Sequence, residues 1–212
     1  MITHIIVALL VLINLQMLGS SRLGGLIRAV ALEALLMGFL TLVIHTGQFT
    51  WYEWVVIGST ITVKSVLLPL LLKRALHETV VRRDVEPLVG YSLSLFFGLL
   101  FVGISALAVV KMPMPPIHTS PLVIMAGMLT VCTGLFLIIT RTKAITQTIG
   151  YLVLENGIYA LGIALAAESP FIVELGILLD VFVGVFVMGI MIENINREFD
   201  NIDTTQLTSL KD

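Results

Sequence analysis

The chain has 212 residues, of which 58% are hydrophobic and only 12% are charged, and its formal net charge is -2. About a quarter of the residues in a water-soluble domain are charged, so this composition excludes an ordinary soluble protein and indicates a surface that mostly faces lipid. The single cysteine, Cys132, excludes an intrachain disulfide, a four-thiolate zinc site and an iron–sulfur cluster held by this chain alone.

Seven apolar segments are long enough to cross a bilayer, whose core of roughly 30 Å requires roughly 20 residues of helix. In chain order they span residues 2–18, 24–45, 54–72, 88–110, 121–140, 146–167 and 171–192. The first segment lacks the basic region of a signal peptide, so we expect it to be an uncleaved helix. The sequence therefore predicts an all-α, polytopic membrane protein with seven transmembrane helices.

Basic residues are distributed unevenly between the two sides of this predicted bundle. One set of connectors holds ten of the 12 lysine and arginine residues, whereas the opposite loops hold only Lys111 and the bilayer holds Lys64. Cytoplasmic loops carry the excess of basic residues in membrane proteins. We therefore expect the N-terminus outside and the C-terminus in the cytoplasm.

The placement of the segments suggests a weak internal repeat of two three-helix units, residues 1–74 and 121–196. Between them, residues 75–120 would form a basic cytoplasmic loop, the fourth helix and a proline-rich outer loop. One helix separates the units, so they would run in the same direction, unlike the inverted repeats of many transporters. Residues 197–212 would form a cytoplasmic tail.

Four ionisable side chains interrupt the apolar segments: Glu33, Lys64, Glu155 and Asp180. A charge near the centre of a membrane helix costs roughly 2.5–3.5 kcal/mol on insertion scales, so such residues face a protein interior or water and often mark ion paths. Glu33 and Glu155 also occupy corresponding positions in the two units. All four are candidate proton-translocation residues.

A medium of low dielectric favours the neutral carboxyl, so Glu155 is suited to take and release a proton, and Asn156 and Tyr159 are nearby hydrogen-bond partners. Its alternative role is a protonated acid that only bonds a neighbouring helix. Lys64 is expected to pair with Glu33, either as a modulator of that acid or as a static ion pair. Pro69 is expected to kink the same helix.

Asp180 lies between Gly176 and Gly184, and small residues at that spacing let another helix approach closely. This arrangement suits two helices that share a proton path. The alternative is an ion pair with a cation on a partner chain.

The last third of the chain resembles the K subunit of complex I, with a basic RTK after segment 121–140, Glu155 in mid-helix and Asp180 where that family has a glutamate. The whole chain resembles component E of the hydrogenase-4, or formate hydrogenlyase-type, complexes. That likeness rests on four segments: TVKSVLLPLLLKRA, IGYLVLENG, ELGILLDVFVGVFVMG and NIDTTQLTSLKD.

The resemblance implies a non-catalytic subunit in the membrane arm of a nickel–iron hydrogenase complex, beside antiporter-like subunits and joined to a soluble iron–sulfur arm. The membrane would be the cytoplasmic membrane of a bacterium or an archaeon. In that family the paired acids belong to a row of ionisable residues along the membrane midplane. Proton or sodium movement would be coupled there to hydrogen metabolism. Asp180 is one methylene shorter than the family's glutamate, so a water would have to bridge it.

Three rival functions stay open: a structural linker between antiporter-like subunits, a stand-alone transporter, and a subunit of a multi-subunit cation/proton antiporter. The sequence holds no glycine-rich phosphate loop and no nucleotide fingerprint. Its four histidines are scattered, and no basic patch is large enough for nucleic acid. We therefore expect no catalytic centre, cofactor or metal in this chain, and no nucleic-acid partner.

Overall fold

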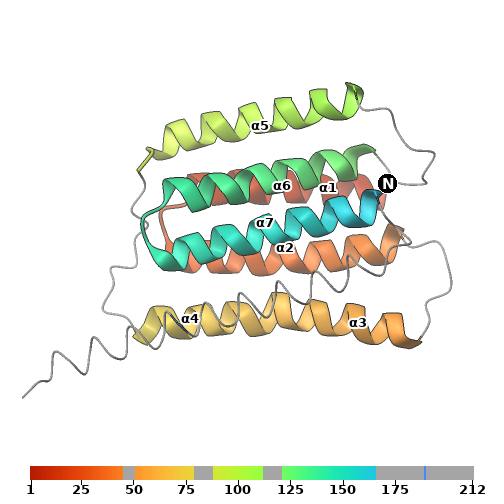
Figure 1. Cartoon of the computed structure of the whole chain (residues 1–212), viewed down its shortest axis with the longest axis horizontal. Coiled ribbons are helices and arrows are strands. Elements are labelled where there is room, and N and C mark those ends of the chain that lie inside the picture. The colour runs from red at the N-terminus through yellow and green to blue at the C-terminus, as the bar shows by residue number, and fades with distance from the viewer. Residues whose placement is uncertain (45–50, 79–87, 112–120, 166–188, 190–212) are drawn as a thin grey trace, which may run out of the picture.

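A computed structural model of the chain describes residues 1–44, 51–78, 88–111, 121–165 and 189 (Figure 1). Within these residues the structure is helical and contains no β-strand. The helices are α1 (Ile2–Gly19), α2 (Leu23–Ile44), α3 (Trp51–Thr62), the π-helical segment η1 (Val63–Leu67), α4 (Leu68–Glu78), α5 (Tyr91–Lys111), α6 (Pro121–Thr140) and α7 (Ala144–Leu165).

Five of these helices, α1, α2, α5, α6 and α7, are long and apolar enough to cross a membrane. They confirm five of the seven predicted segments. The predicted segment 54–72 falls in a continuous helical stretch that η1 divides, so that α3 and α4 are each too short to qualify alone. Apart from residue 189, the seventh segment, 171–192, lies outside the described residues together with Asp180, so the parallel repeat stays a prediction.

Four helices form the centre of the bundle, and the others lie on its two flanks (Figure 1). In the centre, α1 and α6, α6 and α7, α7 and α2, and α2 and α1 are neighbours. On one flank α5 packs against α6 and α1, and on the other α3, η1 and α4 pack against α2. We call the end where the chain begins the amino-terminal side, and the end with the α1–α2 and α6–α7 connections the turn side.

Glycines bring α6 and α7 into backbone contact. A Cβ atom at Gly134 of α6 would overlap the backbone of Leu154, and a Cβ atom at Gly157 of α7 would lie 2.5 Å from the backbone nitrogen of Val131. Only the absence of side chains permits such an approach, as at other small-residue interfaces between membrane helices. This close packing fixes the position of the middle of α7.

Two buried apolar clusters fill the central bundle, one toward each side of the membrane. The turn-side cluster includes Leu18, Leu23, Leu26, Leu72, Leu137 and Ile149. The amino-terminal cluster includes Val7, Leu10, Leu40, Val123 and Ala160. Between them lies a level of buried polar side chains, which we call the polar layer: Asn14, Glu33, Lys64, Thr130, Glu155 and Asn156.

Arg141 ties the turn-side ends of three helices together. Its side chain is buried, its Nη2 donates a hydrogen bond of 3.0 Å to the carbonyl oxygen of Leu18, and its guanidinium lies 5.5 Å from the centre of the Tyr91 ring. Burial lowers the pKa of this guanidinium, although arginine keeps its charge in proteins. A cation here complements the negative ends of the α1 and α6 dipoles.

Candidate functional site

The polar layer contains a buried ion pair between η1 and α7. The Nζ atom of Lys64 lies 2.6 Å from Oε1 of Glu155, and the two side chains are only 7% and 3% exposed. At this depth neither charge has ready access to water, and each stabilises the other. The described part of the chain therefore holds a charged pair at the middle of a membrane-length bundle.

Lys64 owes its position to the π-helical segment that contains it. In η1 the backbone N–H of Leu68 bonds to the carbonyl oxygen of Val63, five residues earlier. Pro69 follows directly, and proline lacks the N–H that an α-helix would direct at the carbonyl of Ser65. Where the sequence predicts a kink at Pro69, the structure has a π-helical turn, a feature often found at functional sites.

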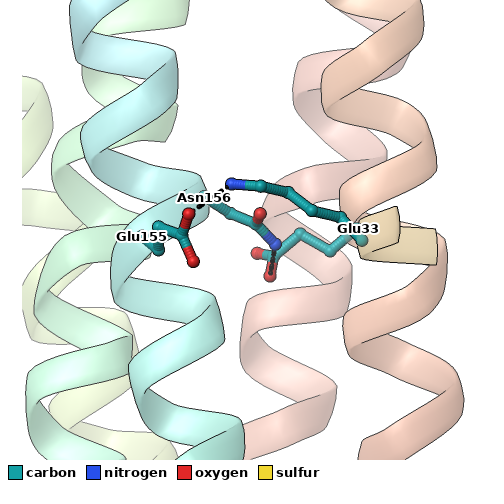
Figure 2. A network of polar contacts seen from close by, with 4 residues as sticks. Glu33, Glu155 and Asn156 are labelled. Carbon is teal, nitrogen blue, oxygen red and sulfur yellow. Dashed lines mark hydrogen bonds and ion pairs between the residues drawn. The ribbon is translucent and has the colours of Figure 1, made fainter. Parts of the chain in front are cut away.

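Glu33 of α2 is fully buried and is held by two amide side chains rather than by a cation. Asn14 of α1 donates to its Oε1 at 3.0 Å, and Asn156 of α7 donates to its Oε2 at 3.3 Å. Figure 2 shows Asn156 reaching from α7 toward Glu33, beside Glu155. Both carboxyl oxygens of Glu33 therefore accept hydrogen bonds from uncharged donors.

Asn14 connects this carboxyl to α6. Its Nδ2 atom also lies 3.0 Å from Oγ1 of Thr130 and 2.9 Å from the carbonyl oxygen of Leu10. Since Glu155 and Asn156 are adjacent on α7, the ion pair and the amide contacts form one polar layer that reaches α1, α2, η1, α6 and α7. Such a layer can pass a change of charge from one helix to the next.

Two predicted contacts are wrong in their partners. The ion pair of Lys64 is with Glu155 and not with Glu33, because the long lysine side chain extends from η1 past α2 to α7. Asn156 donates to Glu33 and not to its neighbour Glu155. The Tyr159 hydroxyl shares a hydrogen bond of 3.1 Å with Thr41, and the Tyr159 ring lies 5.6 Å from the Lys64 ammonium, a cation–π distance.

Two other buried polar residues, Asn14 and Thr130, join helices at the site. Asn14 of α1 is an interhelical hydrogen-bond donor. Thr130 was not foreseen, since a threonine in a membrane helix usually bonds its own backbone and gives no separate signal. Asp180 lies outside the described residues. Within the described ranges, no group of three or more histidine, cysteine or acidic side chains is placed to hold a metal ion.

Comparison with known proteins gives relatives in three bacteria. The chain is 34% identical over 159 residues to the uncharacterised protein Rv0085 of Mycobacterium tuberculosis, covering 73% of this chain and 70% of the relative. It is 29% identical over 156 residues to the hydrogenase-4 component E of Escherichia coli K12 and to that of Shigella flexneri, covering 73% of this chain and 71% of each relative. No protein-family profile matches. No solved structure matches either.

Proposed function

We propose that the chain is a member of the hydrogenase-4 component E family, to which it is 29% identical over 156 residues, and an integral membrane subunit of a membrane-bound nickel–iron hydrogenase complex. Its partners would be antiporter-like and other membrane subunits, with a soluble iron–sulfur arm that carries the electrons. The five membrane-length helices support the membrane location. The proposed orientation, N-terminus outside, rests on the distribution of basic residues.

In this proposal the subunit contributes ionisable residues to proton, or sodium, translocation coupled to hydrogen metabolism. Glu155 would release and regain a proton. Lys64 would control the protonation of Glu155 by moving toward it or away from it. Glu33 would respond through Asn156, and Asp180 would extend the path beyond the described residues. Because these groups interact closely, a change of charge at one alters the proton affinity of the next.

One observation carries the proposal: a charged pair and a second, fully buried carboxyl lie at one level between two apolar clusters. Burial of charge at this depth is expensive, and in membrane proteins it usually serves the movement of ions. The rival function is a structural linker, in which the same pair only holds η1 against α7. The two functions differ in what happens when Glu155 loses its ability to ionise.

The decisive experiment is Glu155→Gln in the native complex, in membrane vesicles that oxidise or evolve hydrogen. We expect hydrogenase turnover and co-purification of the partner subunits to persist while hydrogen-linked proton translocation is lost. A linker predicts unchanged translocation. Purification of a particle that contains only this chain would contradict the assignment to a complex altogether.

A further inference from the structure

A small pocket lies beside the Lys64–Glu155 pair, on its amino-terminal side. Four polar side chains line it: Thr60 of α3, Lys64 of η1, and Asn156 and Tyr159 of α7. Ala34 and Gly38 of α2 complete one wall. Thr60 lies one turn before Lys64, on a helical stretch that runs from the amino-terminal side toward the turn side. Tyr159 lies one turn after Glu155, on a helix that runs in the opposite direction. The pocket therefore extends from the ion pair toward the amino-terminal side.

The size and lining of this pocket fit one water molecule. Its free space is about that of a single water, and a buried water needs two to four polar partners, which these four side chains supply. The Lys64 ammonium in its wall disfavours a metal cation, and the Glu155 carboxylate next to it disfavours an anion. A neutral molecule that can both donate and accept hydrogen bonds is the occupant that suits both charges.

Polar side chains continue beyond the pocket toward the amino-terminal side. The Tyr159 hydroxyl in its wall bonds to Thr41, which lies in the last turn of α2, close to the amino-terminal side. In the opposite direction the ion pair borders the turn-side cluster, where Val30, Leu68 and Val153 are almost completely buried. Within the described residues, polar groups therefore lead from the ion pair through the pocket to Thr41, near the amino-terminal side.

We propose that this pocket holds a water molecule that links the Lys64–Glu155 pair to the Tyr159 hydroxyl, forming the first step of a hydrated branch from the polar layer to the amino-terminal side of the membrane. The branch would let the pair exchange protons with that side. The use of the branch for protons rests on the proposed function, whereas the hydration of the pocket does not.

The test compares two alanines of α2 as sites for a cysteine probe, in the full chain within its native membranes and with Cys132→Ser as background. Ala34 and Ala29 are 5% and 6% exposed, but Ala34 lines the pocket and Ala29 belongs to the turn-side cluster. Ag⁺, which is close to water in size, is added to each side of oriented vesicles; the Lys64 ammonium disfavours a resident cation, but the silver–thiolate bond traps an ion that enters only briefly. A cysteine that has reacted with Ag⁺ is blocked to maleimide. The reaction of Ag⁺ with Ala34→Cys or Ala29→Cys is therefore measured as the loss of maleimide labelling after denaturation.

We expect Ag⁺ added from the amino-terminal side to react with Ala34→Cys about tenfold faster, or more, than with Ala29→Cys. Equal rates, or faster reaction from the turn side, would overturn the proposal. Thr60→Cys approaches the same pocket from α3 and gives an independent reading if Ala34→Cys does not accumulate. Silver access does not require proton translocation. If Ag⁺ does not distinguish Ala34→Cys from Ala29→Cys while Glu155→Gln abolishes translocation, the hydrated branch is refuted and the proposed function is not.

Discussion

Glu33 and Glu155 lie at one level of the bundle on neighbouring helices, yet their surroundings differ. Glu155 has the ammonium of Lys64 at 2.6 Å, whereas Glu33 has the amides of Asn14 and Asn156 at 3.0 and 3.3 Å. Both side chains are buried, so exposure does not distinguish them. What distinguishes them is the charge of the donor.

Because their hydrogen-bond donors differ in charge, these two glutamate side chains can take different roles. An adjacent ammonium stabilises the ionised carboxylate, so Glu155 is tied to the position of Lys64. An amide can donate through its nitrogen or accept through its oxygen, so the site around Glu33 suits either protonation state after an amide rotates. One acid lies beside a charged donor, and the other lies between neutral donors.

The largest expected effect comes from removing the cation alone. Lys64→Met leaves Glu155 buried without its ammonium, and breaking a buried pair in this way costs about 3–5 kcal/mol. We expect that loss in the free energy of unfolding, measured by titration of the purified chain from mild detergent into a denaturing one.

The double variant Lys64→Met with Glu155→Gln is the control for this prediction. Removing both charges should recover most of the lost stability, because uncharged replacements of a buried pair are often tolerated. A double variant as unstable as Lys64→Met alone would show that the lysine stem, and not its charge, is what η1 requires.

The second prediction concerns the glycine contact that positions α7 and therefore both carboxyl sites. Gly157→Ala places a methyl group against the backbone of α6, and overpacking of this kind costs about 1–3 kcal/mol. Gly103→Ala on α5 is the matched control, since nothing lies within 4 Å of a Cβ atom there and alanine favours helix. Thermal unfolding in detergent should separate the two, and equal midpoints would contradict the role of the contact.

The third prediction removes one amide from Glu33. Asn14→Leu leaves Oε1 without this donor, and interhelical hydrogen bonds of this kind contribute about 0.6–2 kcal/mol in membrane proteins. Gln16→Leu, on the exposed face of the same helix, should have no measurable effect on the free energy of unfolding. If both substitutions change stability equally, the hydrogen bonds of Asn14 contribute nothing specific.

The smallest effect is expected for Glu33→Gln, which keeps the shape of the side chain and needs no compensating charge. We expect a loss below about 1 kcal/mol, within the range of one neutral hydrogen bond. Glu155→Gln should cost more, because it leaves Lys64 buried beside an uncharged partner. Equal losses of unfolding free energy in the two variants would remove the distinction between the two acids.

The helices were predictable from the sequence because the length of an apolar segment is set by the thickness of a bilayer. The level of the site was predictable too, since Glu33, Lys64 and Glu155 interrupt those segments near their middles. The pairing was not, because hydropathy gives neither the neighbours of a helix nor the face that a π-helical turn presents. Lys64 and Glu33 lie on consecutive apolar segments, but the lysine side chain extends past α2 to α7.

The π-helical turn has a consequence for chain length. Its hydrogen bond encloses one residue more than that of an α-helix, and one residue corresponds to about 100° of rotation around the helix axis. A variant shortened by one residue between positions 63 and 67 would make this stretch α-helical and leave α3 and α4 on their present faces, because the wider π-helical turn takes up that extra residue. It would keep every apolar segment and its lysine. The extra residue of η1 therefore changes the direction of the side chains inside that turn, Lys64 among them, without turning the helices on either side.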